Sequence, residues 1–202
     1  MKHSQNDEER IALRYFGERM GAFMDLGAND GETLSNTRAL ALLGWGGLCV
    51  DASPRAFDKL RRLYADRPDV DCLHAAIWEA NGSIVLHESG SHLSAADVGL
   101  VSSLDKEETE RWVTEEFNEV RVPAITVMDA IRRSQHKRFD LVSIDIEGVD
   151  LMALQQMHLG AMGCSMLIVE VNDRGIAPYI EHCAEHGLSL IHRNAENLIF
   201  AR

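Results

Sequence analysis

Short apolar runs alternate with longer segments of helical periodicity along most of this chain. The apolar runs predict strands, and segments in which apolar residues recur every three or four positions predict helices. Strands are expected at residues 22–26, 48–50, 70–77, 83–87, 140–144 and 166–169, and helices at 8–20, 33–43, 54–65, 126–134, 149–158 and 175–186. Because strands that alternate with helices are joined by crossovers, the pattern predicts a mainly parallel sheet with helices on both faces.

Two regions depart from this alternation. Residues 188–192 and 198–201 flank a polar turn and predict a C-terminal antiparallel hairpin. Residues 87–106 are rich in Ser and His without a sustained period, and a charged helix is expected at 105–117. We therefore expect one α/β domain over residues 1–202, with an N-terminal helix within 1–21 and a lid or substrate segment at 87–118.

Composition and charge exclude several classes of function. The chain has 202 residues, of which 46% are hydrophobic, as in an ordinary globular domain. Its 20 basic and 32 acidic residues give a net charge of -12, which argues against a nucleic-acid partner, since phosphates need a cationic face. No apolar run is long enough to span a membrane, and the polar first ten residues lack a signal-peptide core. These observations favour a cytoplasmic protein without a membrane partner.

A glycine-rich turn follows the first predicted strand, in the segment Asp25-Leu26-Gly27-Ala28-Asn29-Asp30-Gly31. The glycines let the backbone approach a ligand, and the next predicted helix would offer its positive N-terminus. The second predicted strand ends in Asp51, about twenty residues further on. A carboxylate at that spacing can accept hydrogen bonds from two vicinal ribose hydroxyls. The two features together predict a nucleoside cofactor.

The turn does not fit a dinucleotide such as NAD. A G-x-G-x-x-G motif starting at Gly27 would need glycine where this chain has Asn29 and Glu32. The negative charge of Glu32 would also oppose a pyrophosphate. An acid within the loop, Asp25, instead suits a ligand with positive charge, such as the amino group or sulfonium of S-adenosylmethionine. An NAD-dependent oxidoreductase is therefore disfavoured.

Several motifs in register resemble those of the FkbM-type methyltransferases, which depend on S-adenosylmethionine. They are Asp25 to Gly31, Gly44-Trp45-Gly46-Gly47, Asp51-Ala52-Ser53-Pro54, Ser143-Ile144-Asp145-Ile146-Glu147-Gly148 and Val169-Glu170-Val171-Asn172. The resemblance runs from about Ala22 to the C-terminus and departs at Asp51, where relatives usually have Glu. It implies a Rossmann-like class I methyltransferase fold with a mainly parallel seven-stranded sheet and a C-terminal antiparallel hairpin.

The resemblance also implies cofactor-binding roles for individual residues. Within the glycine-rich loop, the methionine end of the cofactor would contact Asp25, Gly27 and Asn29, with Ala28 and Gly31 completing the loop. Asp51 would bind the ribose hydroxyls, and Ser53 would assist or simply cap the following helix. Ala76 and Ile77 would pack beside adenine, although core packing explains the same two residues equally well.

Asp145 and Glu147 stand two apart at the end of an apolar strand, so strand alternation would point both to one side. The carboxyl ends of parallel strands open into the ligand crevice, where this pair would face the transferred methyl group, Asp145 also contacting the cofactor. Either residue could act as general base on a hydroxyl. Alternatively, the pair could hold a divalent cation together with Glu170 or Asn172. In a third interpretation Asp145 only positions the cofactor or loop, and Glu147 interacts with the next helix N-terminus.

The expected reaction is methylation of a hydroxyl oxygen on a sugar, a glycan or another small metabolite, as the family resemblance implies. A non-catalytic protein that binds S-adenosylmethionine in a regulatory or scaffolding role is the alternative. His87 and His92 flank the predicted lid and are candidates for contact with the acceptor or for base chemistry.

Overall fold

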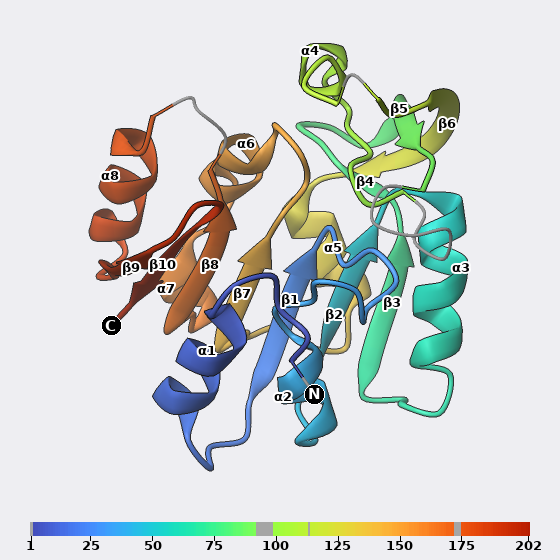
Figure 1. Ribbon diagram of the computed structural model, residues 1–202. Coiled ribbons are helices and arrows are strands. Elements are labelled where there is room, and N and C mark those ends of the chain that lie inside the picture. The colour runs from blue at the N-terminus through green and yellow to red at the C-terminus, as the bar shows by residue number, and fades with distance from the viewer. Residues whose placement is uncertain (1, 92–98, 113, 172–174) are drawn as a thin grey trace.

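A seven-stranded sheet in the order β3-β2-β1-β7-β8-β10-β9 forms the centre of the computed structural model, which describes residues 2–91, 99–112, 114–171 and 175–202 (Figure 1). The strands are β1 (Ala22–Leu26), β2 (Gly46–Asp51), β3 (Val70–His74), β7 (Leu141–Ile144), β8 (Met166–Glu170), β9 (Ser189–Arg193) and β10 (Asn197–Ala201). The strands from β3 to β8 in that order are parallel, whereas β10 pairs antiparallel with β8 and β9. This arrangement confirms the predicted sheet and its terminal hairpin.

Helices cover both faces of the sheet. Successive strand residues point to opposite faces and therefore pack in two different apolar clusters. Phe23 and Leu141 pack in the cluster with α1 (Glu8–Phe16), α2 (Arg38–Leu42) and α3 (Pro54–Leu63). Met24 and Val142 pack in the cluster with α5 (Val127–Arg133), α6 (Asp150–Gln155), α7 (Leu159–Met162) and α8 (Ala177–Glu185). In the described ranges, no helix is both long and apolar enough to cross a membrane.

Two helix starts follow the capping rules that the sequence predicted. Ser53 accepts a hydrogen bond from the backbone N–H of Ala56 at 3.2 Å, and Pro54 occupies the first turn of α3. Thr126 accepts from the N–H of Asp129 at 3.2 Å at the start of α5. Each side chain satisfies a backbone donor that the first turn of a helix leaves without an intrahelical partner.

The helix predicted at 33–43 is wrong at its start, because α2 begins only at Arg38. Leu34 has a φ of 55°, a left-handed conformation that cannot continue a helix. The carboxylate of Asp30 accepts from the backbone N–H groups of Glu32 and Thr33, which holds these residues in a turn. The glycine-rich loop is therefore followed by an irregular segment rather than by a helix N-terminus.

A second sheet, which the sequence did not reveal as separate, lies above the C-terminal end of β3 (Figure 1). It contains β4 (Ala76–Ile77), β5 (Gly82–Ser89) and β6 (Phe117–Ile125) in the order β4-β6-β5. The single strand predicted at 70–77 is thus split at Ala75, where the chain leaves one sheet for the other. The charged helix predicted at 105–117 is reduced to α4 (Lys106–Thr109). The helix predicted at 8–20 likewise ends at Phe16, before Gly17 with its φ of 57°.

Candidate active site

The carboxyl ends of three neighbouring parallel strands bring acidic and polar side chains together. Asp25 of β1 is in register with Cys49 of β2 on one side and with Ser143 of β7 on the other. Asp51 stands two residues after Cys49, so alternation turns both side chains to the face covered by α1, α2 and α3. The sheet therefore directs these strand-end groups into one region.

Two adjoining pockets open at this edge of the sheet. The first, which we term the Asp51 pocket, is lined by Asp51, Ser53, Ala76, Ile77 and Leu86, among others. The second, which we term the Asp25 pocket, is lined by Asp25, Ala28, Asn36, Ser143 and Glu170, among others. Both pockets share Gly27, Asn29, Leu100, Asp145 and Glu147, which therefore lie where the two pockets adjoin, a place that we term the passage.

Asp51 is buried, and its carboxylate anchors the glycine-rich loop. It accepts hydrogen bonds from the backbone N–H of Asn29 at 2.7 Å and from that of Ser53 at 2.8 Å. Burial raises the pKa of Asp51 to about 7, and the two N–H donors offset only part of this effect. The carboxylate thus fixes the loop while one edge of it faces the pocket.

Asp25 is also buried and receives a hydrogen bond from the hydroxyl of Thr37 at 2.6 Å. Burial raises the pKa of Asp25 to about 6, and the Thr37 hydroxyl lowers it. Thr37 belongs to the irregular segment before α2, so this segment supplies a partner that the predicted helix would not have placed here.

The glycines of the loop have different roles. Gly27 has a φ of 85°, and a Cβ atom there would lie 1.7 Å from the carbonyl oxygen of Asp145, so no other residue fits. Gly31 lies outside the residues that line either pocket in the described chain and packs against Leu60 and Leu63, side chains of α3. The close approach of Gly27 to Asp145 joins the loop of β1 directly to the end of β7.

Asp145 and Glu147 reach the pockets by a route other than the predicted strand alternation, because β7 ends at Ile144. Glu147 has a φ of 50° and is followed by Gly148 with a φ of 97°, so the chain turns here. Asp150 accepts from the N–H of Ile146 at 2.9 Å and from that of Gly148 at 3.1 Å, which stabilises the turn. The turn, and not the pleat of a strand, brings both carboxylates to the passage between the pockets.

Three carboxylates gather at this passage. Asp145, Glu147 and Glu170 each offer a ligand atom, and these atoms all lie within 4.8 Å of one another. Burial, together with the charges of neighbouring acids, raises the pKa of Asp145 and of Glu170 well above the ordinary carboxyl range. The guanidinium of Arg111 opposes this effect at Glu170. Positive charge brought to this group would therefore be stabilised by it.

Comparison with known proteins places this arrangement in a family. The sequence profile of the methyltransferase FkbM domain matches residues 25–186. The chain belongs to the FkbM methyltransferase family. No curated protein matches the sequence. Membership confirms the resemblance seen in the motifs, and the family implies S-adenosylmethionine as the cofactor.

Solved structures of methyltransferases share the fold. A methyltransferase FkbM from Methylobacillus flagellatus aligns with a TM-score of 0.58 at 12% identity, covering 91% of this FkbM-family chain. This chain spans 44% of that protein's length. The ribosomal protein L11 methylase of Lactobacillus delbrueckii subsp. bulgaricus aligns with a TM-score of 0.52 at 12% identity, covering 96% of this chain and 75% of the other. These likenesses confirm the class I methyltransferase fold.

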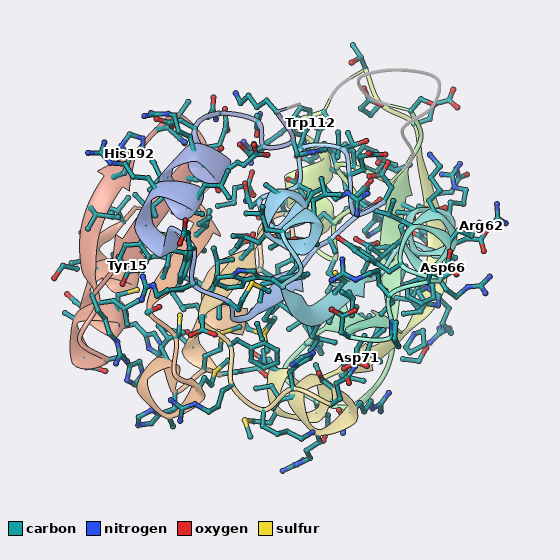
Figure 2. All side chains as sticks on the ribbon, turned by 90° about the horizontal axis from the view of Figure 1, so that it is seen from below. Tyr15, Arg62, Asp66, Asp71, Trp112 and His192 are labelled. Carbon is teal, nitrogen blue, oxygen red and sulfur yellow. The ribbon has the colours of Figure 1, made fainter. Side chains whose placement is uncertain are left out.

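The family motifs do not include all residues that line the Asp25 pocket. Gln5, Arg111, Trp112 and Glu196 also line it, and Figure 2 shows Trp112 on the segment that follows α4. No periodicity or motif marks these residues in the sequence, because each comes from a loop or a chain segment outside the strands. The lid predicted at 87–118 includes Arg111 and Trp112, whereas Gln5 and Glu196 lie outside it.

The predicted lid residues are placed only in part. His87 lies on β5, where its backbone N–H donates to the carbonyl of Ser103 at 2.9 Å, and it lines neither pocket. The hydroxyl of Ser103 donates to the carbonyl of Glu147 at 2.6 Å, so this segment supports the turn after β7. His92 and Asn172 lie outside the described residues, and their predicted roles stay predictions.

Proposed function

We propose that this chain transfers the methyl group of S-adenosylmethionine to a hydroxyl oxygen of a small or glycan-type acceptor. The observation that supports the proposal is the pair of adjoining pockets, which share Asp145 and Glu147 at their junction. One pocket would take the nucleoside end of the cofactor, and the other its methionine end and the acceptor. S-adenosylmethionine, when bound, supplies an electrophilic methyl group on a positively charged sulfur.

The proposed cofactor contacts follow from the chemistry of each pocket. In the Asp51 pocket, the Asp51 carboxylate would accept from the ribose hydroxyls, with Ser53 beside it. Ala76 and Ile77, both buried, offer an apolar surface for adenine. In the Asp25 pocket, Asp25 would pair with the cofactor's amino group, while Gly27, Ala28 and Asn29 supply the backbone beside the methionine part.

Asp145 is the general base of the proposed reaction. A neutral hydroxyl is a weak nucleophile, and a carboxylate beside it can remove its proton as the oxygen attacks. Burial and neighbouring acids raise the pKa of Asp145, which makes it a stronger base than an ordinary Asp. Glu147 and Glu170 lie close to Asp145 and offer further carboxylate oxygens to a sulfonium. Alignment of acceptor and methyl group by the pocket walls would supply the rest of the rate.

A divalent cation is the second mechanism that the donor set fits. Three carboxylates within 4.8 Å of one another offer the oxygen ligands that Mg²⁺ or Ca²⁺ prefers. A cation held there by Asp145, Glu147 and Glu170 would lower the pKa of the acceptor hydroxyl. The guanidinium of Arg111 already supplies positive charge to Glu170, so this carboxylate has less need of a cation. This contact favours the general-base mechanism over the metal mechanism.

The proposed function is tested by calorimetry and by turnover. We expect the purified protein to bind S-adenosylhomocysteine and not NAD. We further expect it to release S-adenosylhomocysteine when it is given S-adenosylmethionine and a panel of sugar and phenol hydroxyl acceptors. Binding without turnover on any acceptor would favour the alternative, a non-catalytic binding protein, and binding of NAD alone would contradict both.

Cofactor affinity should depend on pH in a direction that the two buried aspartates determine. The pKa of Asp25 is raised to about 6 and that of Asp51 to about 7, so both carboxylates are largely protonated near pH 5.5. Their proposed partners, an ammonium and two hydroxyls, bind the ionised form better. We expect the affinity for S-adenosylhomocysteine, measured by calorimetry, to rise from about pH 5.5 to about pH 7.5. An affinity that is constant over this range would contradict the assigned contacts.

A further inference from the structure

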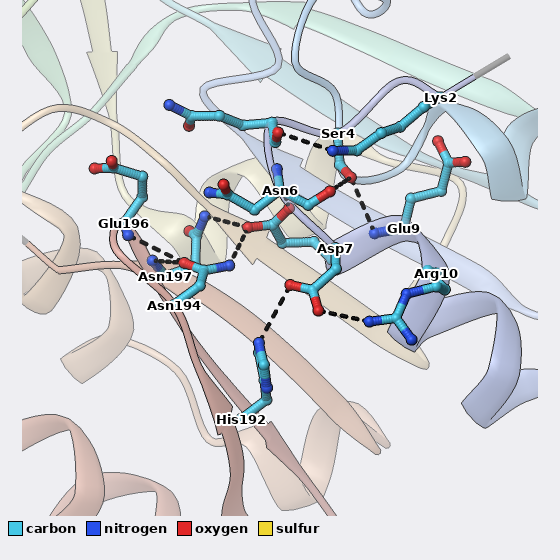
Figure 3. A network of polar contacts seen from close by, with 12 residues as sticks. Lys2, Ser4, Asn6, Asp7, Glu9, Arg10, His192, Asn194, Glu196 and Asn197 are labelled. Carbon is cyan, nitrogen blue, oxygen red and sulfur yellow. Dashed lines mark hydrogen bonds and ion pairs between the residues drawn. The ribbon is translucent and has the colours of Figure 1, made fainter.

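The segment of residues 2–7, which we term the strap, leads into Glu8, which accepts a hydrogen bond from Asn194 in the tip of the terminal hairpin, residues 194–197 (Figure 3). The strap contributes Gln5 to the lining of the Asp25 pocket, and the hairpin tip contributes Glu196. These two residues come from opposite ends of the described chain. Both line the Asp25 pocket, and we term the strap and the hairpin tip together the wall.

A buried carboxylate holds the strap to the hairpin. Glu8 is fully buried and accepts from the side-chain amides of Asn194 at 2.6 Å and Asn197 at 2.9 Å. It also accepts from the backbone N–H of Asn6 at 2.9 Å, which fixes the end of the strap. Three donors around one buried carboxylate define a single position for this wall.

The strap also contacts the irregular segment that follows the glycine-rich loop. Ser4 forms a parallel bridge with Leu34, which has a left-handed conformation and lines the Asp25 pocket. Asp7 accepts from Nε2 of His192 on β9 at 3.2 Å, and this contact is visible in Figure 3. The strap therefore has contacts to this segment as well as to the hairpin.

Both parts of the wall lie outside the family match, which covers residues 25–186. We propose that the strap and the hairpin tip form an acceptor subsite in which Gln5 and Glu196 determine specificity, favouring cationic or neutral acceptors over anionic ones. The inference rests on the proposed function. It assigns acceptor selection to chain segments that the family motifs do not include.

The charge preference follows from the lining of the Asp25 pocket. Its acidic members are Asp25, Asp145, Glu147, Glu170 and Glu196, and its one basic member among the described residues is Arg111. Glu196 adds to the negative potential at Asp145, as its contribution to the raised pKa of Asp145 indicates. The cofactor would bring positive charge to Asp25 and to the shared carboxylates, whereas the proposed function assigns no cofactor contact to Glu196. An anionic group of the acceptor would therefore meet uncompensated negative charge there.

Three matched probes test the subsite: methyl glucoside, its 6-amino-6-deoxy derivative and methyl glucuronide, which are neutral, cationic and anionic at one carbon. Their binding to the complex with S-adenosylhomocysteine is measured by calorimetry. We expect the cationic probe to bind about tenfold more tightly than the anionic one, with the neutral probe between them. Glu196→Gln should reduce this ratio about threefold.

Gln5→Ala should weaken the binding of all three probes by about threefold, because it removes an uncharged hydrogen-bonding group. The matched controls are Gln155→Ala and Glu181→Gln, which change exposed residues of α6 and α8 outside both pockets. Both controls should behave as the original chain does.

Three results would overturn the subsite: equal binding of the probes, binding of none of them, or variants of Gln5 and Glu196 that match their controls. Each presupposes that S-adenosylhomocysteine still binds, which is measured first in every variant. Loss of that binding in the unaltered chain would instead refute the proposed function. The two failures are therefore distinguishable.

Discussion

Asp145→Asn should lower kcat for methyl transfer about 10²- to 10⁴-fold, the range attributed to a positioned general base. The asparagine keeps the size of the side chain but cannot take a proton from the acceptor. Affinity for S-adenosylhomocysteine should remain within a few fold, because the ribose and amino contacts are assigned to Asp51 and Asp25. Release of S-adenosylhomocysteine from S-adenosylmethionine, followed at saturating cofactor, measures the loss.

The same variant should be more stable than the original chain above neutral pH. The folded-state pKa of Asp145 is raised, so its ionisation destabilises the fold as pH increases through that pKa. Asparagine removes this penalty, and the urea midpoint at about pH 9 should therefore increase. Lower activity with higher stability would rule out misfolding as the cause, and retained activity would contradict the base assignment.

Chelation distinguishes the general-base mechanism from the metal mechanism, and a variant far from the pockets serves as the control. Treatment with EDTA should leave turnover unchanged if Asp145 acts as a base, whereas loss that Mg²⁺ restores would favour the metal mechanism. Asp66→Asn is the matched control, because Asp66 is exposed beside α3, away from Trp112 and the Asp25 pocket (Figure 2). It should change neither activity nor stability appreciably.

Asp51→Asn should weaken the binding of S-adenosylhomocysteine about 100-fold, since hydrogen bonds to a buried charged group are worth roughly 1.5–3 kcal/mol each. The amide would place an NH₂ group against the backbone N–H of either Asn29 or Ser53, both of which donate to the carboxylate. The loop that faces the ribose would then lose one of its anchors. Calorimetric titration measures the affinity directly.

Asp51→Glu tests the length of the side chain. Glu keeps the carboxylate on a longer arm, so the variant should retain more affinity than Asp51→Asn. If the Asn variant bound S-adenosylhomocysteine as tightly as the original chain, Asp51 would not be the ribose ligand. In that case its hydrogen bonds to the loop would be its whole role.

The strand-end residues could be predicted because parallel strands impose a simple rule. Asp25 and Asp51 each end an apolar run, and the carboxyl ends of such runs meet at one edge of a sheet. Period-2 alternation then determines which face each side chain takes. The fold class and the two aspartates follow from local patterns of five or six residues.

The connecting segments could not be predicted in the same way. Leu34 and Glu147 have positive φ, a conformation that neither residue type signals in the sequence. Asp30 and Asp150 stabilise the two turns through side-chain hydrogen bonds to nearby N–H groups, which propensity for helix or strand does not include. The predicted strand alternation therefore placed Glu147 near the site for a wrong reason.

The wall formed by the strap and the hairpin tip could not be predicted, because it depends on contacts between distant parts of the chain. From the sequence, Glu8 is expected to be an ordinary exposed acid in the first turn of an amphipathic helix. Its burial is caused by Asn194 and Asn197, whose amides have no pattern that points back to it. Polar contacts between residues so far apart in the chain cannot be predicted from local sequence patterns.

The Glu8 contacts also bear on the order of events during synthesis. Its two amide partners follow it by 186 and 189 residues, so the ribosome must add nearly the whole described chain before they can meet. Contacts of such separation form late, after nearby segments have already paired. The glycine-rich loop and its aspartates can therefore assemble while the strap is still undocked. A nascent chain would acquire a cofactor site first and a selective acceptor site only at the end.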